Sequence, residues 1–112
     1  QHFAVHHCGK TMEHVVDGYS KLKGLEFAEV GAFSDLKTVR QKLPGIFLNA
    51  RYSPVRLMKA SESEIHEEVA ALARDGHENG KNLSISCVGI DKNMPDEQIR
   101  YFLKACREVT IC

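Results

Sequence analysis

The chain alternates between two hydrophobic periods, one of about two residues that suits a strand and one of about 3.6 that suits a helix. Short apolar runs predict four strands, at residues 3–8, 25–33, 46–50 and 83–87. Apolar residues three and four apart predict helices at residues 10–23, 34–43 and 61–76, and a last helix that begins at Pro95. Residues 51–60 are expected to form a loop or a short turn of helix around Pro54.

Several of the predicted helix ends carry local signals. Thr11 is a candidate N-cap of the first helix, and Gly24 follows the last residue of that helix. Ser61 and Glu64 have the spacing of a capping box ahead of the third helix. Pro95 stands where the last helix begins, and two acidic residues follow it. These signals place a helix between successive strands and another after the last one.

Four strands, each followed by a helix, make four consecutive βα units. Such units imply an α/β fold with a parallel sheet, because a parallel partner strand needs a crossover connection. A complete (β/α)8 TIM barrel has eight such units in about 250 residues. The 112 residues are therefore expected to form a single domain, either half of a TIM barrel or a small open α/β sheet, as a fragment of a larger enzyme. Because a half-barrel leaves two strand edges unpaired, we also expect a homo-oligomer that forms through these edges.

The composition is that of a globular protein, with 43% hydrophobic and 27% charged residues. Fifteen basic residues balance fifteen acidic ones, so the charge does not favour binding to nucleic acid or to an anionic membrane. No apolar stretch reaches the length of a membrane span, no signal peptide is visible, and nothing requires the four cysteines to form disulfides. We therefore expect a cytoplasmic protein.

The first strand ends in the sequence HHCG, which places reactive side chains at its tip. Side chains two residues apart on a strand point the same way, so His6 and Cys8 share a face, and Cys87 ends the last strand. If the carboxyl ends of the strands meet at one rim, these three side chains make a ligand set for a catalytic zinc ion with one open position. The alternative is that His6 is an ordinary hydrogen-bonded residue and that the cysteines are small apolar residues.

Four stretches of the chain, in order, resemble the C-terminal part of the uroporphyrinogen decarboxylase superfamily: HHCGKT, FSDLKTVRQKLPG, FLNARYSPVRLMKASESEIHEEV and CVGIDKNMPDEQIRYFLKACREV. The most similar branch is that of the zinc-dependent methylcobamide:thiol methyltransferases, since uroporphyrinogen decarboxylases use no metal and lack the cysteine pair. The resemblance implies that residues 1–112 are the C-terminal half of a TIM barrel. It also implies that His6, Cys8 and Cys87 bind Zn²⁺, and that a small thiol on the zinc receives a methyl group from a methylcobamide held by a corrinoid protein.

One loop departs from the family pattern. The family's Gly-Asn-x-Asp-Pro loop is similar to LNARYSP here, which keeps Asn49 and Pro54 but loses the glycine and the aspartate. Because that loop lies near the mouth of the active site in the family, the resemblance implies that Asn49 and Arg51 bind the substrate. Glu29 and Asp35 are candidates to support a metal ligand or to contact the substrate, or else to be solvated at a strand and to cap a helix.

Two other functions stay open at this point. A metal-free carboxy-lyase acting on a tetrapyrrole needs cations for the carboxylates of its substrate, and Arg51 and Arg56 lie near the altered loop. A non-catalytic module that binds a corrinoid protein or a sibling subunit suits the short length and the balanced charge.

Overall fold

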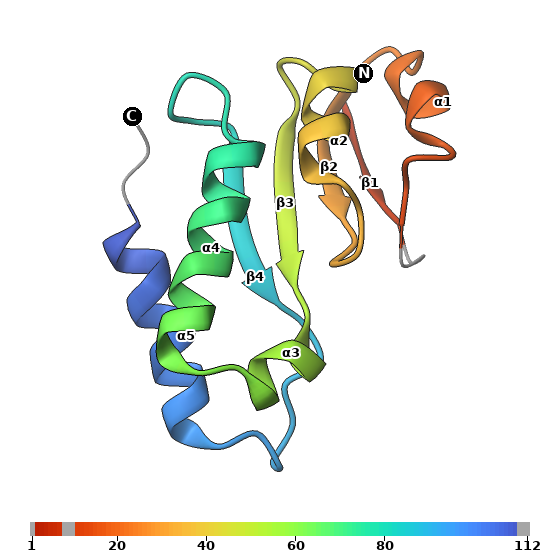
Figure 1. Ribbon diagram of the computed structural model, residues 1–112. Helices are drawn as coiled ribbons and strands as arrows, with labels where there is room; N and C mark the ends of the chain where they lie inside the picture. The colour runs from red at the N-terminus through yellow and green to blue at the C-terminus, as the bar shows by residue number, and fades with distance from the viewer. Residues whose placement is uncertain (1, 8–10, 110–112) are drawn as a thin grey trace.

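The computed structural model describes residues 2–7 and 11–109 (Figure 1). Its elements follow the order β1 (Phe3–His6), α1 (Val16–Ser20), β2 (Leu25–Val30), α2 (Leu36–Lys42), β3 (Phe47–Tyr52), α3 (Pro54–Lys59), α4 (Glu62–Gly76), β4 (Leu83–Cys87) and α5 (Asp96–Glu108). The four strands are all parallel and lie in the sheet order β1-β2-β3-β4. The predicted α/β fold with a parallel sheet is therefore confirmed. Within the described residues, no helix is long and apolar enough to cross a membrane.

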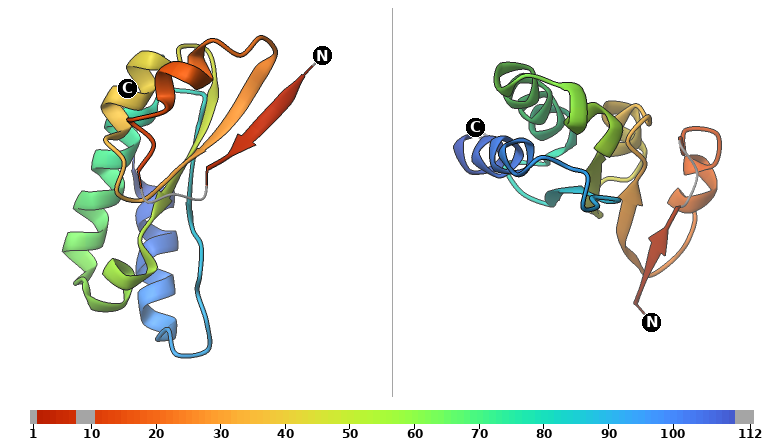
Figure 2. Two further views of the ribbon diagram at one scale, coloured as in Figure 1. Left: turned by 90° about the vertical axis from the view of Figure 1, so that its right-hand side faces the viewer. Right: turned by 90° about the horizontal axis from the view of Figure 1, so that it is seen from below.

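The helices all lie on one side of the sheet, as the two views of Figure 2 show for the described part of the chain. Two clusters of buried side chains fill the space between helices and sheet. The first lies under α1 and α2 and consists of Met12, Val16, Ala28, Val30, Leu36, Val39, Leu43, Leu48 and Ala50. The second lies under α3, α4 and α5 and consists of Tyr52, Leu57, Ala60, Ile65, Val69, Met94, Phe102 and Ala105. Strand residues alternate between the two faces, so every second side chain of β2 and β3 enters this core.

The first helix is much shorter than the predicted helix at residues 10–23. It begins at Val16, and Val15 at the N-cap position makes no side-chain capping hydrogen bond. The prediction of Thr11 as the N-cap is therefore wrong, and the carbonyl oxygen of Thr11 instead accepts a hydrogen bond from the ring of His7. Two β-branched residues at the start and Gly18 inside the helix lower its propensity, so burial of the apolar face, and not length, holds this segment in place.

The third strand is longer at its carboxyl end than predicted. Arg51 and Tyr52, expected in a loop, are its last two residues and pair with Ser86 and Cys87 of β4. The pairing partner is more than thirty residues away in the sequence, and it supplies the backbone hydrogen bonds that keep this polar segment extended. Arg51 is therefore fixed in the sheet and not in a flexible connection.

The signals at the starts of α2, α3 and α4 have the effects that the sequence indicates. Ser61 and Glu64 form a complete capping box at the start of α4, with hydrogen bonds of 3.2 and 3.0 Å. The short turn of helix expected around Pro54 is α3, which has this proline in its first turn. Asp35 caps α2 by accepting hydrogen bonds from Thr38, so helix capping is the role that the structure gives it.

Candidate functional site

The face of the sheet turned away from the helices, here called the open face, carries a row of polar side chains. His6, Glu29, Asn49 and Ser84 are successive Cα partners across β1, β2, β3 and β4. They point away from the helices, because Ala28, next to Glu29 on the strand, is buried under the helices. Nδ1 of His6 lies 2.7 Å from Oε2 of Glu29, and Oγ of Ser84 donates to Oδ1 of Asn49 at 3.2 Å. The polar row therefore consists of two hydrogen-bonded pairs.

The His6–Glu29 pair orients a reactive imidazole. A carboxylate only accepts hydrogen bonds, so Nδ1 is the donor in this contact, and in the neutral ring the lone pair then lies on Nε2. Nε2 has no hydrogen-bond partner among the described residues, and the side chain of His6 is 57% exposed. A nitrogen in this position can take a proton from a substrate or bind a metal ion, and a carboxylate behind the ring assists either role. Of the roles considered for Glu29 from the sequence, support of His6 is the one that fits this contact.

Arg51 lies two residues after Asn49 on β3, so its side chain shares the open face. Its Nη2 donates to the carbonyl oxygen of His7 at 2.8 Å, which joins β3 to the segment that follows β1. Nε of Arg51 and Oγ of its Cα partner Ser86 are buried without a hydrogen-bond partner in the described part of the chain. A buried polar atom without a partner costs about 1–3 kcal/mol, so this corner of the open face favours a polar group brought in from elsewhere.

Cys87 is the last residue of β4 and lies on the opposite face from the polar row. It follows Ser84 by three residues, and an odd separation on a strand reverses the direction of the side chain. Its side chain packs against the second core cluster, next to its Cα partner Tyr52. Burial raises the pKa of the Cys87 thiol, which keeps it protonated at neutral pH. It is also three strands away from His6, on the order of 14 Å across the sheet.

The predicted site residues thus fall into three groups. His6 lies on the open face together with Asn49 and Arg51, the two predicted substrate-binding residues. Cys87 lies on the helix-covered face, and Cys8 lies outside the described residues. In residues 2–7 and 11–109, no three His, Cys, Asp or Glu side chains are arranged to hold a metal ion.

Sequence reasoning did not single out Ser84 and Ser86. The signal for them is the alternation in Leu83–Cys87, where serines occupy every second position of an otherwise apolar strand. Such alternation predicts a strand with one polar face. Predicting the contact between His6 and Glu29 requires knowledge of the strand register as well.

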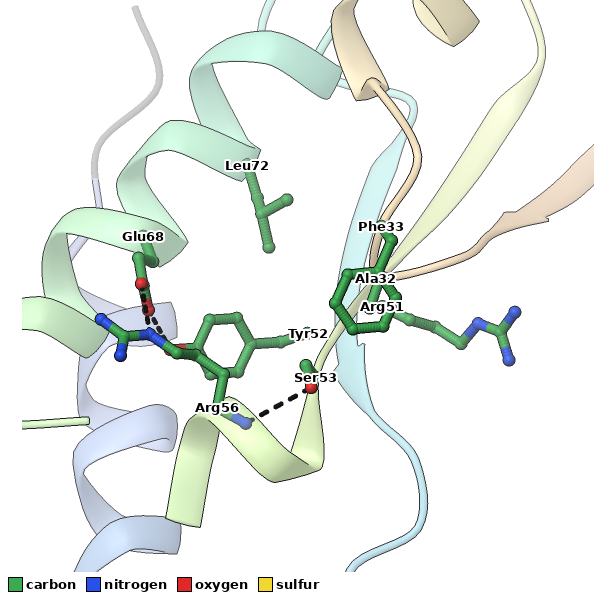
Figure 3. A pocket seen from close by; sticks show the side chains of 8 residues that line it. All are labelled: Ala32, Phe33, Arg51, Tyr52, Ser53, Arg56, Glu68 and Leu72. Carbon is green, nitrogen blue, oxygen red and sulfur yellow. Dashed lines mark hydrogen bonds and ion pairs between the residues drawn. The ribbon is translucent and has the colours of Figure 1, made fainter. Parts of the chain in front are cut away.

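A cavity of about 260 Å³ lies on the other side of β3, near its carboxyl end (Figure 3). Its apolar walls include Ala32, Phe33 and Leu72, and its polar end is formed by Tyr52, Arg56 and Glu68. The hydroxyl of Tyr52 donates to Glu68, whose other oxygen accepts from Nε of Arg56 at 2.6 Å. Burial, followed by the bond to Glu68, raises the pKa of Tyr52 and keeps it a donor. Because the polar atoms of these three residues form hydrogen bonds with one another, we interpret the network as a structural link between α3 and α4.

Arg56 also donates through Nη2 to Oε2 of Glu64 at 2.7 Å, and this second carboxylate predicts a pH dependence of stability. The backbone N–H of Ser61, and after it the guanidinium of Arg56, lower the pKa of Glu64 from its usual 4.5 to about 2. A carboxylate with a lowered pKa in the folded state stabilises the fold above the unfolded-state pKa, and this contribution is lost as the pH falls from 4.5 through about 2. Glu64→Gln is therefore expected to be less stable than the wild type at pH 7 and to converge with it near pH 2.

Urea unfolding followed by circular dichroism across this pH range measures the difference. Glu67→Gln is the matched control, because Glu67 is an exposed residue of the same helix with no hydrogen bond or ion pair in the described residues. A constant difference between wild type and Glu64→Gln at every pH would contradict the prediction.

The sequence matches no protein-family model, and it has no significant match among curated proteins. The resemblance to the uroporphyrinogen decarboxylase superfamily therefore stays an interpretation of the sequence motifs.

Proposed function

We propose that the chain forms half of a (β/α)8 barrel enzyme of the uroporphyrinogen decarboxylase superfamily, and that it moves a methyl group from a methylcobamide to a thiol. The observation that carries the proposal is the His6–Glu29 pair, which holds an imidazole with its Nε2 exposed at the carboxyl end of a parallel strand. Reactive groups of α/β enzymes collect at that end of the strands. A parallel sheet with sequential strands and helices on one side only is also the arrangement expected of half a barrel.

Zinc fits only part of this site. His6 suits a metal ligand, because Glu29 holds its other ring nitrogen. Cys87 does not suit one, because its thiol faces the helices and burial opposes the thiolate form that a metal requires. His6 and Cys87 of the predicted set therefore do not come together as ligands of one zinc ion, and Cys8 lies outside the described residues.

The His6–Glu29 pair can activate a thiol directly. A free thiol has a pKa of about 8.5, so only a small part of it is the nucleophilic thiolate at neutral pH. Nε2 of His6 takes the proton from sulfur, and the carboxylate of Glu29 stabilises the imidazolium that forms. The thiolate then attacks the methyl carbon, so that the carbon–sulfur bond forms while the carbon–cobalt bond breaks and its electron pair stays with the cobamide of the partner corrinoid protein.

The test is the conversion of methylcobalamin and 2-mercaptoethanol to the S-methyl thioether in the presence of the chain. We expect the reaction rate, measured from the change in the cobalamin absorption spectrum, to be proportional to the concentration of the chain. Metal analysis of the same sample shows whether zinc accompanies the activity. A rate equal to that of the reactants without protein would contradict the proposal.

A metal-free carboxy-lyase is the second candidate, and Arg51 favours it. Arg51 lies on the same face as His6, forms no ion pair in the described residues, and has a buried Nε without a partner. Such a cation suits a carboxylate of the substrate. Decarboxylation of uroporphyrinogen by the chain, lost in Arg51→Met and retained in His6→Ala, would favour this function over methyl transfer.

A further inference from the structure

The connection between α4 and β4 is a tight turn with Asn79 and Gly80 at its tip. The N–H of Glu78 donates to the carbonyl oxygen of Lys81 at 2.9 Å, and the N–H of Lys81 donates to that of Glu78 at 3.1 Å. The two residues between them have positive φ, 55° at Asn79 and 76° at Gly80, as a type I′ turn requires. The geometry of the turn therefore accounts for the choice of asparagine and glycine.

An asparagine followed by a glycine is also a chemically reactive pair. The backbone nitrogen of the second residue can attack the side-chain amide carbon of the first, and a glycine leaves this nitrogen unshielded because it has no Cβ. Asn79 and Gly80 are both exposed, and a Cβ placed on Gly80 would meet no atom within 4 Å. The side chain of Asn79 makes no hydrogen bond to the rest of the described chain. The tip of the turn is therefore open for this reaction.

The ring of His77, the C-cap residue of α4, lies beside the nitrogen that would attack. The backbone N–H of Gly80 donates to Nδ1 of His77 at 3.0 Å, so Nδ1 carries the lone pair of a neutral imidazole. An amide nitrogen becomes a nucleophile only as it loses its proton, and a base that is already bonded to this proton can take it. Asn82 also has a positive φ, of 64°, but a branched residue, Leu83, follows it and its side chain is bonded to Glu78. The reactive arrangement is therefore specific to Asn79.

We propose that His77 promotes the deamidation of Asn79, which makes the turn a site of spontaneous covalent modification. Nδ1 of His77 takes the proton from the nitrogen of Gly80, and the electron pair of this nitrogen forms a bond to Cγ of Asn79. The bond between Cγ and the side-chain nitrogen breaks, and this nitrogen leaves as ammonia with the proton that His77 returns. Water then opens the cyclic imide at either of its carbonyl carbons, which gives an aspartate or an isoaspartate at position 79.

The modification is expected to weaken the contacts that the turn makes with α2 and β3. Either product adds a negative charge next to Glu78, whose carboxylate accepts a hydrogen bond from the N–H of Gly45 at 2.9 Å. An isoaspartate also lengthens the backbone of the turn, close to the carbonyl oxygen of Asn82 that accepts from Nη2 of Arg40 at 2.8 Å. The inference does not rest on the proposed function, because this turn lies at the opposite edge of the sheet from the candidate site.

Peptide mapping by mass spectrometry, after incubation of the folded chain at neutral pH, follows the loss of the side-chain amide at each asparagine. We expect the loss at Asn79, with the aspartate and isoaspartate peptides separated by chromatography. Asn82 is the internal control, and its amide is expected to remain over the same period. An amide that persists at Asn79, or an equal rate of loss at Asn82, would overturn the inference.

His77→Gln separates the action of the imidazole from the reactivity of the Asn-Gly pair, because glutamine can accept the same hydrogen bond but is not a base. We expect the variant to lose the amide of Asn79 about ten-fold more slowly, less than the usual 10² to 10⁴-fold contribution of a general base because the contact is exposed to solvent. In urea that unfolds the chain, the two proteins should react at the same rate, since the turn no longer holds the ring against Gly80.

His66→Gln is the matched control, because His66 is a half-exposed histidine of α4 that makes no contact with the turn in the described residues. It should react at the wild-type rate, and circular dichroism verifies that both variants are folded. Equal rates in the folded wild type and folded His77→Gln would contradict the role of His77. A difference between them that persists in urea would also contradict it, because the effect would then not come from the folded turn.

Discussion

His6→Ala is expected to lower the rate of thiol methylation by about 10² to 10⁴-fold, the usual contribution of a general base. The imidazole is exposed and its only hydrogen bond among the described residues is to Glu29, so the substitution removes the base without disturbing the core. Imidazole added to the solution is expected to restore part of the rate, because a free base can enter the space that the side chain leaves. The measurement is the initial rate of methylcobalamin consumption, with and without added imidazole.

Glu29→Gln tests the positioning role of the carboxylate. It is expected to lower the rate by about 10 to 100-fold, the usual effect of removing the partner of a functional histidine. The pair of His2 and Glu26 provides the matched control, since it has the same chemistry, a separation of 2.6 Å and high exposure at the other end of the same strands. His2→Ala should leave the rate unchanged. Equal losses in His2→Ala and His6→Ala would show that neither histidine acts on the substrate.

Arg40→Met is expected to lower the free energy of unfolding by about 3 to 5 kcal/mol, because it removes the four hydrogen bonds that a largely buried guanidinium donates to backbone carbonyl groups. Arg40 is 9% exposed and donates to the carbonyl oxygens of Gly76 (2.7 Å), Leu43 (3.1 Å), Ile46 (2.8 Å) and Asn82 (2.8 Å). It thereby joins the ends of α2 and α4 to the starts of β3 and β4. The hydrogen bonds of one guanidinium thus link four elements at the amino-terminal edge of the sheet.

Urea unfolding of the two proteins measures this effect. Arg100→Met is the matched control, because Arg100 is exposed on α5 and its loss should change the stability by less than about 0.5 kcal/mol. Arg40→Lys keeps the charge and fewer donors, so its stability should fall between those of Arg40→Met and the wild type. This second variant gives a measurable value if Arg40→Met is too unstable to purify. A change below 1 kcal/mol in both variants at Arg40 would contradict the assigned role.

The predictions for His6 and for Arg40 concern opposite edges of one sheet. At the amino-terminal edge, Arg40 has all its partners within the chain and contributes to stability. At the carboxyl-terminal edge, His6 keeps one ring nitrogen without a partner in the described residues, and Arg51 keeps a buried Nε without one. Groups whose bonding is incomplete are the ones available to a ligand, which is the physical basis for placing the candidate site at this edge.

Elements defined by nearby residues could be predicted from the sequence. The start of α4 follows from the capping box of Ser61 and Glu64, and β4 has the bounds predicted from a short run of strand-forming residues. The parallel sheet follows from the alternation of strands and helices, which requires crossover connections. All of these signals act over a few residues or through the order of elements, so a single sequence contains them.

The remaining features depend on contacts between distant segments. Arg51 and Tyr52 read as a loop because they are polar and precede a proline, and only their pairing with β4 makes them a strand. The pairing of His6 with Glu29, and the placement of Cys87 on the other face, follow from the register of the strands. Composition and periodicity by themselves determined that this chain is a parallel α/β sheet with polar strand ends. Which of those polar residues meet was decided by the tertiary structure, because a shift of one residue in register turns every side chain of a strand to the opposite face.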